Sequence, residues 1–430
     1  MAHSPYPESG ARESAAHTED DVMATSKRAL WGATLAAALV ATTAQAATLT
    51  VNPGPDAQER LQTALLDAKP GDVVALGAGK FDFTDGLSLD VDNVTVTGAG
   101  QGKTVLSFAG QKGAGEGLLI TSDGVTVRDL TLQDSKGDGI KSKGADRISF
   151  VSLTVQWTGG PKETNGAYGV YPVSSTNVLI DKVTVRGASD AGIYVGQSKN
   201  IIVRNSLAEF NVAGIEIENS TDADVFDNVA SHNTGGILVF DLPGLPVMGG
   251  HSTRIFRNKV VDNDTPNFAP KGNIVASVPV GVGIMLMANR DVHVFDNDIS
   301  GNQTSAVMLV SFSRSFDDKS YNPLPRDIVV RDNRLGRNGW LPGLPGGKML
   351  AAATGGSLPP ILWDGVTTYA GYDGPAPRLY LKDGPVLNLN LPKAGEVEAA
   401  KPTVTATLGS PGLPERAAVV LPVGQDKPAQ

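Results

Sequence analysis

Residues 191–240 read AGIYVGQSKNIIVRNSLAEFNVAGIEIENSTDADVFDNVASHNTGGILVF and contain three Gly-Ile pairs at a constant spacing. The pairs begin at Gly192, Gly214 and Gly236, so the repeat is 22 residues long. The same step from Gly or Ala to an aliphatic residue recurs elsewhere, at Gly86, Gly117, Gly139, Gly169, Gly283 and Ala306. A period near 22 residues with β-type alternation predicts a stacked solenoid with one coil per repeat.

Alternation within each repeat predicts which side chains face inward. In the segment Gly214–Glu218, the two isoleucines face the core and the two glutamates face outward, because strand side chains alternate. The stack expected inside contains the aliphatic residues Ile193, Val195, Ile215, Ile217, Ile237 and Val239. No helix-period segment interrupts the strands, so the predicted fold is all-β, a single right-handed parallel β-helix.

An asparagine-rich corner follows the second strand of several repeats. Each of these asparagines lies three residues after an inward-facing aliphatic residue; they are Asn228, Asn258, Asn297 and Asn333. Stacked coils bring such residues into register. The sequence therefore predicts a ladder of side-chain hydrogen bonds along this corner.

Composition limits the class of protein. The chain has 430 residues, of which 41% are hydrophobic, with 50 glycines and 27 prolines, which suits a fold of turns and short strands. There is no cysteine, so disulfides, thiolate metal sites and a c-type haem attachment are excluded within this chain. A net charge of −9 argues against nucleic-acid binding.

The chain divides into five expected regions. Residues 1–46 are read as an upstream extension followed by a secretory signal peptide, with Lys27 and Arg28 before an apolar run and cleavage near Ala46-Ala47. Translation is expected to start at Met23 in place of Met1. Residues 47–85 are predicted to form an N-terminal cap that contains a helix, followed by coils over 86–340, a C-terminal cap over 341–391 and a disordered tail over 392–430. No membrane span is expected in the mature, exported chain, which places it in the periplasm or outside the cell.

Four insertions border the Gly-led strands: Trp157–Gly166, Asp241–Thr253, Asp262–Gly281 and Phe312–Pro325. They rise from neighbouring edges of one face, and insertions on one face of a solenoid usually mark the binding face. They are also unusually apolar. Two interpretations stay open: the loops form the walls of a cleft, or they shield the face.

The candidate ligand-binding residues lie in the outward columns of the Gly-led strands or at the ends of these strands: Lys141, Lys143, Tyr171, Tyr194, Glu216, Glu218 and Asp241. Asp138 and Asp190 lie at neighbouring strand ends. Tyrosine faces are platforms for sugars, and two carboxylates about 7 Å apart, at alternate positions of a strand, can exchange protons or bind a cation such as calcium. Glu216 and Glu218 are therefore the candidate metal ligands. The alternative is that the glutamates are simply solvated and that the tyrosines cover backbone. Leu238 and the methionines of later coils favour a face covered by loops.

The sequences GIYVGQS (192–198), GIEIENS (214–220), NTGGILVFDLP (233–243) and NFAPKGNIVASVP (267–279) resemble a bacterial family of secreted parallel β-helix repeat proteins. The resemblance implies export and a secreted dihaem c-type cytochrome-like protein as neighbour. The coils are similar, more distantly, to pectate lyase-like and mannuronan epimerase-like repeats. The catalytic signatures of those relatives are missing: the nearest match to Asn-Thr-Asp is Asn233-Thr234-Gly235, and Asp-Pro-His-Asp is absent.

Two functional hypotheses follow. In the first, the protein binds or modifies an acidic polysaccharide, and if it is an enzyme, a lyase or epimerase is favoured over a hydrolase. In the second, it is a non-catalytic scaffold that docks the cytochrome-like partner. An open groove with Lys, Tyr and Glu favours the first hypothesis, and a filled groove with a Met-rich face favours the second.

Overall fold

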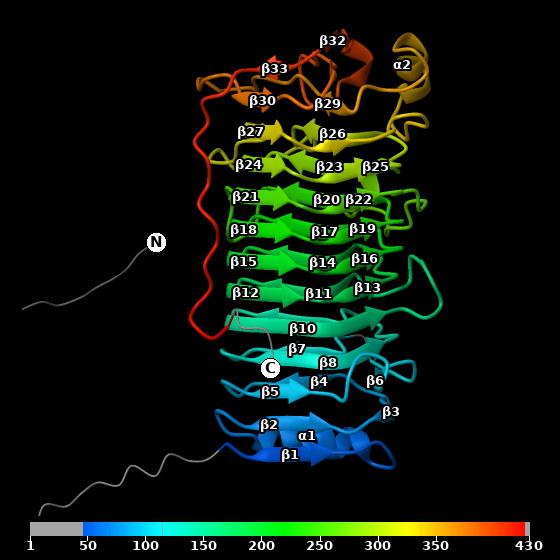
Figure 1. Ribbon diagram of the computed structural model, residues 1–430, viewed down its shortest axis with the longest axis vertical. Helices are drawn as coiled ribbons and strands as arrows, with labels where there is room; N and C mark the ends of the chain where they lie inside the picture. Colours follow the sequence, from blue (N-terminus) through cyan, green and yellow to red (C-terminus); the bar gives the residue numbers. More distant parts are fainter. Residues whose placement is uncertain (1–45, 114, 426–430) are drawn as a thin grey trace, which may run out of the picture. The chain divides into compact units, whose positions relative to one another are not determined.

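The computed structural model describes residues 46–113 and 115–425 (Figure 1). The expected signal peptide, apart from its last residue, and the expected start at Met23 lie outside these residues. Within the described ranges, no helix is long and apolar enough to cross a membrane.

The described chain is a β-helix whose central coils each contribute a strand to each of three faces (Figure 1). The first face is a 12-stranded sheet that carries the Gly-led strands, here called the Gly-led sheet. The second and third faces form one 21-stranded sheet, because β8 and β10 run through the corner between them. Pairing between coils is parallel, except where β32 and β33 join antiparallel at the C-terminal end.

The Gly-led sheet consists of β4 (Leu87–Leu89), β7 (Leu118–Ile120), β9 (Ile140–Lys143), β11 (Tyr168–Val173), β14 (Ala191–Gly196), β17 (Ala213–Glu218), β20 (Gly235–Phe240), β23 (Val282–Met287), β26 (Ser305–Val310), β29 (Ile361–Trp363), β31 (Val386–Asn388) and β32 (Thr403–Thr405). The second face consists of β1 (Thr48–Val51), β2 (Val73–Leu76), β5 (Thr95–Thr97), β8 (Thr126–Gln133), β10 (Asp146–Gln156), β12 (Thr176–Asp181), β15 (Lys199–Arg204), β18 (Thr221–Phe226), β21 (His251–Phe256), β24 (Arg290–Phe295), β27 (Arg326–Arg331), β30 (Leu379–Leu381) and β33 (Leu408–Gly409). The third face, which β8 and β10 enter, consists of β3 (Gly79–Asp82), β6 (Thr104–Ser107), β13 (Thr184–Arg186), β16 (Leu207–Glu209), β19 (Val229–Ser231), β22 (Lys259–Val261), β25 (Asp298–Ser300) and β28 (Arg334–Leu335).

The inward stack expected from the alternation is confirmed. Ile193, Ile215 and Ile237 are in register on neighbouring strands and are fully buried in one continuous core. Val195, Ile217 and Val239 form the next column in the same core. The all-β parallel solenoid predicted from the sequence is therefore the fold of the protein.

The recurrent glycines have a steric cause. A Cβ atom at Gly214 would lie 2.5 Å from the carbonyl oxygen of Gly236 on the next coil, and one at Gly236 would lie 2.6 Å from the carbonyl oxygen of Gly283. Contacts that short are essentially never seen for real Cβ atoms. Glycine lets the backbones of adjacent coils approach at the start of each Gly-led strand.

The asparagine ladder is also present. Asn258 donates from Nδ2 to Oδ1 of Asn297 at 3.0 Å, and it accepts from the backbone and side chain of Asn228 at 3.1 and 3.0 Å. Asn297 continues the ladder to Asn333. A second ladder, which the sequence analysis missed, runs along the corner before the Gly-led sheet through Asn211, Asn233, Asn263, Asn302 and Asn338.

We expect Asn258→Ala to lower the free energy of unfolding by about 2–3 kcal/mol, because it leaves buried backbone and side-chain groups of two coils without partners. Urea denaturation followed by circular dichroism measures the change. The exposed Asn52 provides the control, since Asn52→Ala should change stability by less than about 0.5 kcal/mol. Equal stability of the Asn258 variant and the parent protein would contradict a structural role of the ladder.

Helix α1 (Ala57–Asp67) lies at the N-terminal end, where Leu61 and Leu65 join the core (Figure 1). Its function as a cap stays a prediction. Stacked pairing extends beyond the expected limits 86–340, since β1 already pairs with β2 and β29 pairs with β31. The remaining helical segments are α2 (Gly347–Ala353), η1 (Val275–Ser277) and η2 (Val397–Ala399).

The prediction of a disordered tail is wrong for the described residues from 392 onward. In place of a disordered segment from residue 392, the chain forms η2, β32 and β33 and then runs back along the second face to Gln425 (Figure 1). Composition was misleading here: the segment is rich in Pro, Ala and Val and lacks aromatic residues, yet polar contacts to other coils hold it in place.

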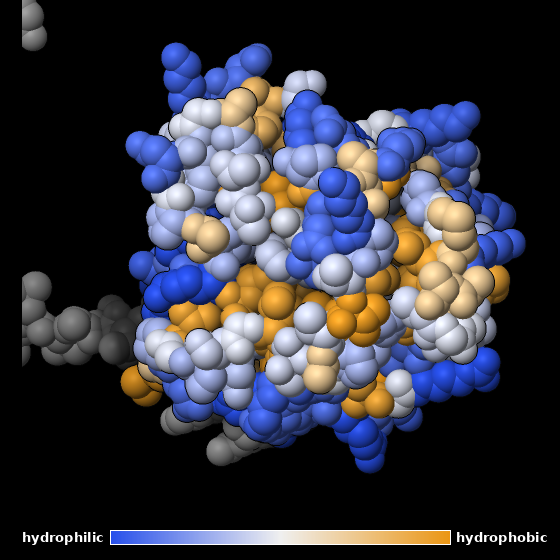
Figure 2. Space-filling view, turned by 90° about the horizontal axis from the view of Figure 1, so that it is seen from above, coloured by the Kyte–Doolittle hydropathy of each residue, from blue (hydrophilic) through white to orange (hydrophobic). Residues whose placement is uncertain are grey.

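The outward side of the Gly-led sheet carries a second hydrophobic core. Leu238, Met285 and Met308 are buried beneath apolar side chains of the inserted loops, among them Val275 and Phe312. Of the two interpretations of the insertions, shielding holds for these later coils. The C-terminal end shows a further band of apolar residues (Figure 2).

Candidate functional site

The predicted site residues lie where the loops stop covering the Gly-led sheet. Toward the N-terminal end, Lys143 on β9 is exposed and Tyr171 on β11 is half-buried. From β14 onward the outward column is buried, and Tyr194 and Glu216 retain only 4% and 1% exposure. The predicted ligand-facing patch, walled by the loops 241–253 and 262–281, does not form around Tyr194, Glu216 and Glu218, because these side chains are buried.

Three tyrosines form one aromatic cluster at this boundary. The ring centroids of Tyr168 lie 4.5 Å from Tyr171 and 4.4 Å from Tyr194, and those of Tyr171 and Tyr194 are 4.9 Å apart. The Tyr194 hydroxyl donates to Oε1 of the buried Glu218 at 2.6 Å. Tyr168 was not among the predicted site residues. The available signal was an aromatic residue directly before Gly169, where the next two coils have Ala191 and Ala213.

Lys141 stands over this cluster with its ammonium group 4.8 Å from the ring centroid of Tyr171. It also pairs with Glu116 at 3.1 Å and with Asp138 at 3.5 Å. Burial lowers the pKa of Lys141, but the hydrogen bond to Glu116 and the charge of Asp138 raise it more, so that the pKa lies above its ordinary value. Lys141 therefore remains a cation at neutral pH and is unsuited to accept a proton.

The carboxyl groups around the tyrosines have raised pKa values. Burial, opposed by Lys141, raises the pKa of Asp138 to about 6. Burial and the charge of Glu218 raise the pKa of Asp190 to about 7, although Asn273 donates a hydrogen bond to it at 2.9 Å. Such groups are suited to exchange protons near neutral pH.

The two predicted glutamates are the most enclosed acids of this region. Burial raises the pKa of Glu218 to about 7 despite the hydrogen bond from Tyr194. Burial, with the charges of Glu218 and Asp190, raises the pKa of Glu216 well above its ordinary value, and its Oε2 has no hydrogen-bond partner. Burial in this cluster therefore favours the neutral form of Glu216 over the carboxylate.

Asp241 does not face a ligand site, contrary to the prediction. It is 3% exposed, and its Oδ1 accepts hydrogen bonds from the backbone N–H groups of Gly249 and Gly250 at 2.8 and 2.9 Å. Its backbone oxygen accepts from the Tyr321 hydroxyl at 2.6 Å. The side chain thus shapes the inserted loop that follows β20.

The described residues contain no group of three or more His, Cys, Asp or Glu side chains arranged to hold a metal ion. Glu216 and Glu218 alone would supply few ligands to calcium, which takes six to eight oxygens. The calcium site predicted from the sequence stays without structural support.

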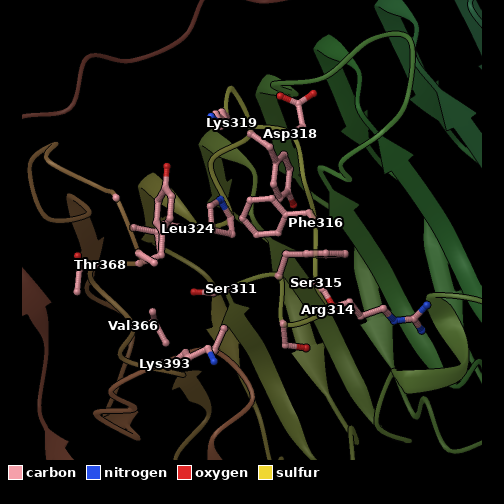
Figure 3. A pocket seen from close by; sticks show the side chains of 18 of the residues that line it. Ser311, Arg314, Ser315, Phe316, Asp318, Lys319, Leu324, Val366, Thr368 and Lys393 are labelled. Atoms are coloured by element: carbon pink, nitrogen blue, oxygen red, sulfur yellow. The ribbon is translucent and has the colours of Figure 1, made fainter.

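A separate cavity of about 670 Å³ opens between the loop after β26 and the loop after β29 (Figure 3). Phe316, Tyr369 and the buried Leu324 line it, and Lys319 and Lys393 lie at its exposed rim. The loops are tied together by Asp364, whose Oδ2 accepts the backbone N–H of Ser311 at 2.6 Å and whose Oδ1 accepts that of Val366 at 3.0 Å. The first loop is the insertion Phe312–Pro325 predicted from the sequence, but none of its residues was predicted to be a site residue.

Arg314 connects this cavity to the covered part of the Gly-led sheet. Its side chain turns away from the cavity (Figure 3) and donates to the backbone oxygens of Gly272 and Asn273 at 2.9 Å each. Asn273 in turn bonds Asp190, so one chain of contacts runs from the cavity loop to the acids beside the tyrosines.

Comparison with known proteins gives the following similarities. Residues 116–266 match the family model described as a right handed beta helix region, which confirms the predicted fold. A ribose-5-phosphate isomerase A from Streptococcus suis (strain 05ZYH33) is 30% identical over 131 residues, which are 30% of this chain and 52% of that protein. The chain thus spans about half the length of the curated relatives it matches.

Among solved structures, the A-module of the mannuronan C-5 epimerase AlgE6 from Azotobacter vinelandii is similar, with a TM-score of 0.46 and 16% identity over 68% of this chain and 87% of that one. An alginate lyase from Paenibacillus sp. str. FPU-7 has a TM-score of 0.45 and 16% identity over 68% of this chain and 96% of that one.

Proposed function

We propose that this right-handed parallel β-helix protein binds an acidic polysaccharide along the open part of the Gly-led sheet. The observation that supports the proposal is the cluster of Tyr168, Tyr171 and Tyr194 at the edge of the loop cover, with Lys141 above it. Aromatic rings give a sugar a flat apolar surface. A cation beside them would favour a sugar that carries a carboxylate.

Charge distribution supports an acidic ligand over a neutral one. Lys112, Lys136 and Lys143 lie on neighbouring coils of the open part and are exposed, and none of them forms an ion pair within the described residues. Lys141 is balanced by Glu116 and Asp138. The exposed lysines therefore supply the free positive charge along the path that we propose for the polymer.

We also propose that the protein modifies the bound sugar as a lyase or an epimerase. A lyase or epimerase needs a group that accepts the C5 proton and a charge that offsets the uronate. The exposed lysines that form no ion pair supply the charge for the second role, and Lys141, which stays protonated, holds Asp138 beside them. Asp138, with a pKa of about 6 and an ion pair to Lys141, is the described group best placed for the first role.

Reversing two exposed charges tests the binding site. We expect the parent protein to bind alginate or polygalacturonate, and Lys136→Glu with Lys143→Glu to weaken binding at least about 10-fold at low salt. The matched control is Lys348→Glu with Lys401→Glu, which changes the net charge equally at exposed positions near the C-terminal end. Titration of labelled polymer measures affinity, and absorbance of unsaturated products reports lyase activity.

Two results would argue against this site. If neither polymer binds the parent protein, the acidic-polysaccharide proposal fails. If both charge-reversed pairs weaken binding equally, the effect follows net charge and not the open part of the sheet.

Docking of a partner protein is a second candidate function. The surface available for it differs from the one expected from the sequence. The Met-rich face expected to dock the cytochrome-like protein is buried, since Met285, Met287 and Met308 lie under the loops. Exposed apolar side chains occur at the C-terminal end, where Met349 is 74% and Val404 50% exposed beside a groove of about 520 Å³ (Figure 2). A cytochrome-like partner at this groove stays a prediction.

Export belongs to the same proposal, because a polysaccharide of this kind lies outside the cytoplasm. We expect the mature protein to begin at or near Ala47 in the periplasm or medium. N-terminal sequencing of the exported protein measures this, and a soluble cytoplasmic product that retains Met1 would contradict it.

A further inference from the structure

The final segment of the described chain, residues 411–425, lies across the second face of the solenoid (Figure 1). Between Glu415 and Gln425 it contacts seven successive strands of this face, from β27 to β10. Six strand spacings of about 4.8 Å amount to roughly 29 Å, and ten extended residues span roughly 33 Å. The segment, here called the strap, therefore runs perpendicular to the strands and is largely extended before Pro422, where a turn closed by the hydrogen bond from the Gln425 N–H to the Pro422 oxygen begins.

Besides an ion pair between the exposed Glu415 and Arg331 at 2.8 Å, the strap makes a second charged contact through Arg416. Its guanidinium donates to Oδ1 of Asp291 at 2.7 Å and also contacts Oδ2. Asp291 is buried and is held independently by a hydrogen bond from Ser252 at 2.9 Å. The acceptor for the arginine is thus fixed by the solenoid itself.

The solenoid also recognises the backbone of the strap. Asp224 accepts the backbone N–H of Val419 at 3.0 Å, while Arg254 fixes the same carboxylate with two hydrogen bonds. Asn200 donates to the backbone oxygen of Val420 at 3.1 Å. Contacts of this type are available to any extended peptide, because they do not use side chains of the strap.

Leu421 is the buried apolar anchor of the strap, and the partly buried Val419 packs against the same cluster. Leu421 is buried against Leu179 and Ile202, two neighbours on adjacent strands, whereas Val420 and Val423 are exposed. Most of the strap is exposed, and a segment with so few buried apolar contacts opens at a lower free-energy cost than the coils beneath it.

The groove continues beyond the place where the described strap ends. A polar hollow of about 640 Å³ extends from Gln425 over the earlier coils and is lined by Arg128, Arg147 and Lys182, among other residues. The binding surface of the second face is therefore longer than the described segment that occupies it.

We propose that the second face is a peptide-binding groove, in which the strap is a displaceable occupant. The partner is an extended segment of another protein that carries an arginine and, five residues later, an aliphatic residue, as Arg416 and Leu421 do. The arginine binds Asp291, the backbone binds Asp224 and Asn200, and the aliphatic residue enters the site formed by Leu179 and Ile202. This site is separate from the proposed polysaccharide site on the Gly-led sheet.

The test uses the full chain with its strap released by Arg416→Glu and Leu421→Asp. The probe is a fluorescein-labelled peptide of residues 411–425, PGLPERAAVVLPVGQ. We expect fluorescence anisotropy to show binding to the released variant at least about 10-fold tighter than to the parent protein, because the tethered strap competes at an effective concentration in the millimolar range. A peptide with both anchor residues replaced by alanine should not bind.

A locked variant provides the opposite control. The chain has no cysteine, so Ile202→Cys with Leu421→Cys can form only one disulfide within the molecule. The oxidised protein should bind no peptide, and reduction should restore the weak binding of the parent. Three results would overturn the proposal. The peptide could bind the released and parent proteins equally, or it could bind the locked form. It could also fail to bind a released variant that keeps the parent's melting temperature. Dimers that exchange straps in the released variant mixed with parent protein would also overturn it in favour of a second copy.

Discussion

Replacing Ile215 with aspartate should lower the free energy of unfolding by more than about 4 kcal/mol and abolish cooperative folding at 37 °C. Ile215 is fully buried between Ile193 and Ile237, which are its partners on the adjacent coils. A carboxylate there would have no cation or hydrogen-bond donor, so it would be forced into an apolar stack, ionised or neutral.

Urea denaturation of the Ile215→Asp variant and of an Ile215→Val variant measures the free energy of unfolding of each. The valine variant removes only one methylene from the same place and should cost about 1 kcal/mol. An Ile215→Asp variant as stable as the valine variant would show that the inward and outward positions are exchanged.

The buried acids should make the protein less stable as the pH rises toward neutrality. The pKa of Glu218 is about 7 in the folded state, and that of an unfolded glutamate is about 4.3. A group with a raised folded pKa holds more protons in the folded state, so its contribution is present in full below about pH 4.3 and is lost as the pH rises through about 7. Glu218 alone accounts for roughly 3 kcal/mol of this loss, and Glu216 adds in the same direction.

Glu216→Gln with Glu218→Gln isolates this effect from other titrating groups. At pH 4.5 the double variant and the parent should differ little, because both carry neutral side chains at these positions. The free energy of unfolding of the variant minus that of the parent should therefore be roughly 3 kcal/mol larger at pH 8 than at pH 4.5. Exposed carboxylates, as strand alternation predicted, could be replaced with almost no change in stability, but Glu216 and Glu218 are only 1% and 8% exposed.

Denaturation curves at the two pH values decide this point. Asp327→Asn is a suitable control at an ion-paired acid outside the buried cluster, at the start of β27. Parallel pH profiles for the parent and the glutamine variant would mean that the two glutamates are solvated, as the alternative interpretation of the sequence held.

The inward stack and the first asparagine ladder could be predicted because each depends on local periodicity. Coils that repeat every 22 residues bring Ile193 onto Ile215. Asn228 and Asn258 are 30 residues apart because of an insertion, but they occupy the same place in successive coils and therefore meet. The state of Glu216 could not be predicted in this way. Its surroundings come from loops that begin more than twenty residues later in the chain. Strand alternation predicts to which side of the sheet a side chain points, but it does not predict which residues cover that side chain.

The same reason explains the remaining differences. Tyr168 belongs to the aromatic cluster through its position one residue before the Gly-led step, outside the two columns that the alternation identifies. The strap was predicted to be disordered because its sequence is rich in Pro, Ala and Val and lacks aromatic residues, a composition that does not reveal which coils it contacts. Its other partners are backbone groups and polar side chains on coils as far away as Ile148.

Hydrogen-exchange mass spectrometry in the presence of an oligouronate tests the central claim most directly. We predict slower exchange in peptides that cover residues 136–145 and 166–174, which contain Lys141, Lys143 and the half-buried tyrosines, and unchanged exchange over 311–325 and 411–425. Slower exchange confined to the cavity loop or to the strap, with no change around β9 and β11, would contradict the placement of the polysaccharide on the open part of the Gly-led sheet.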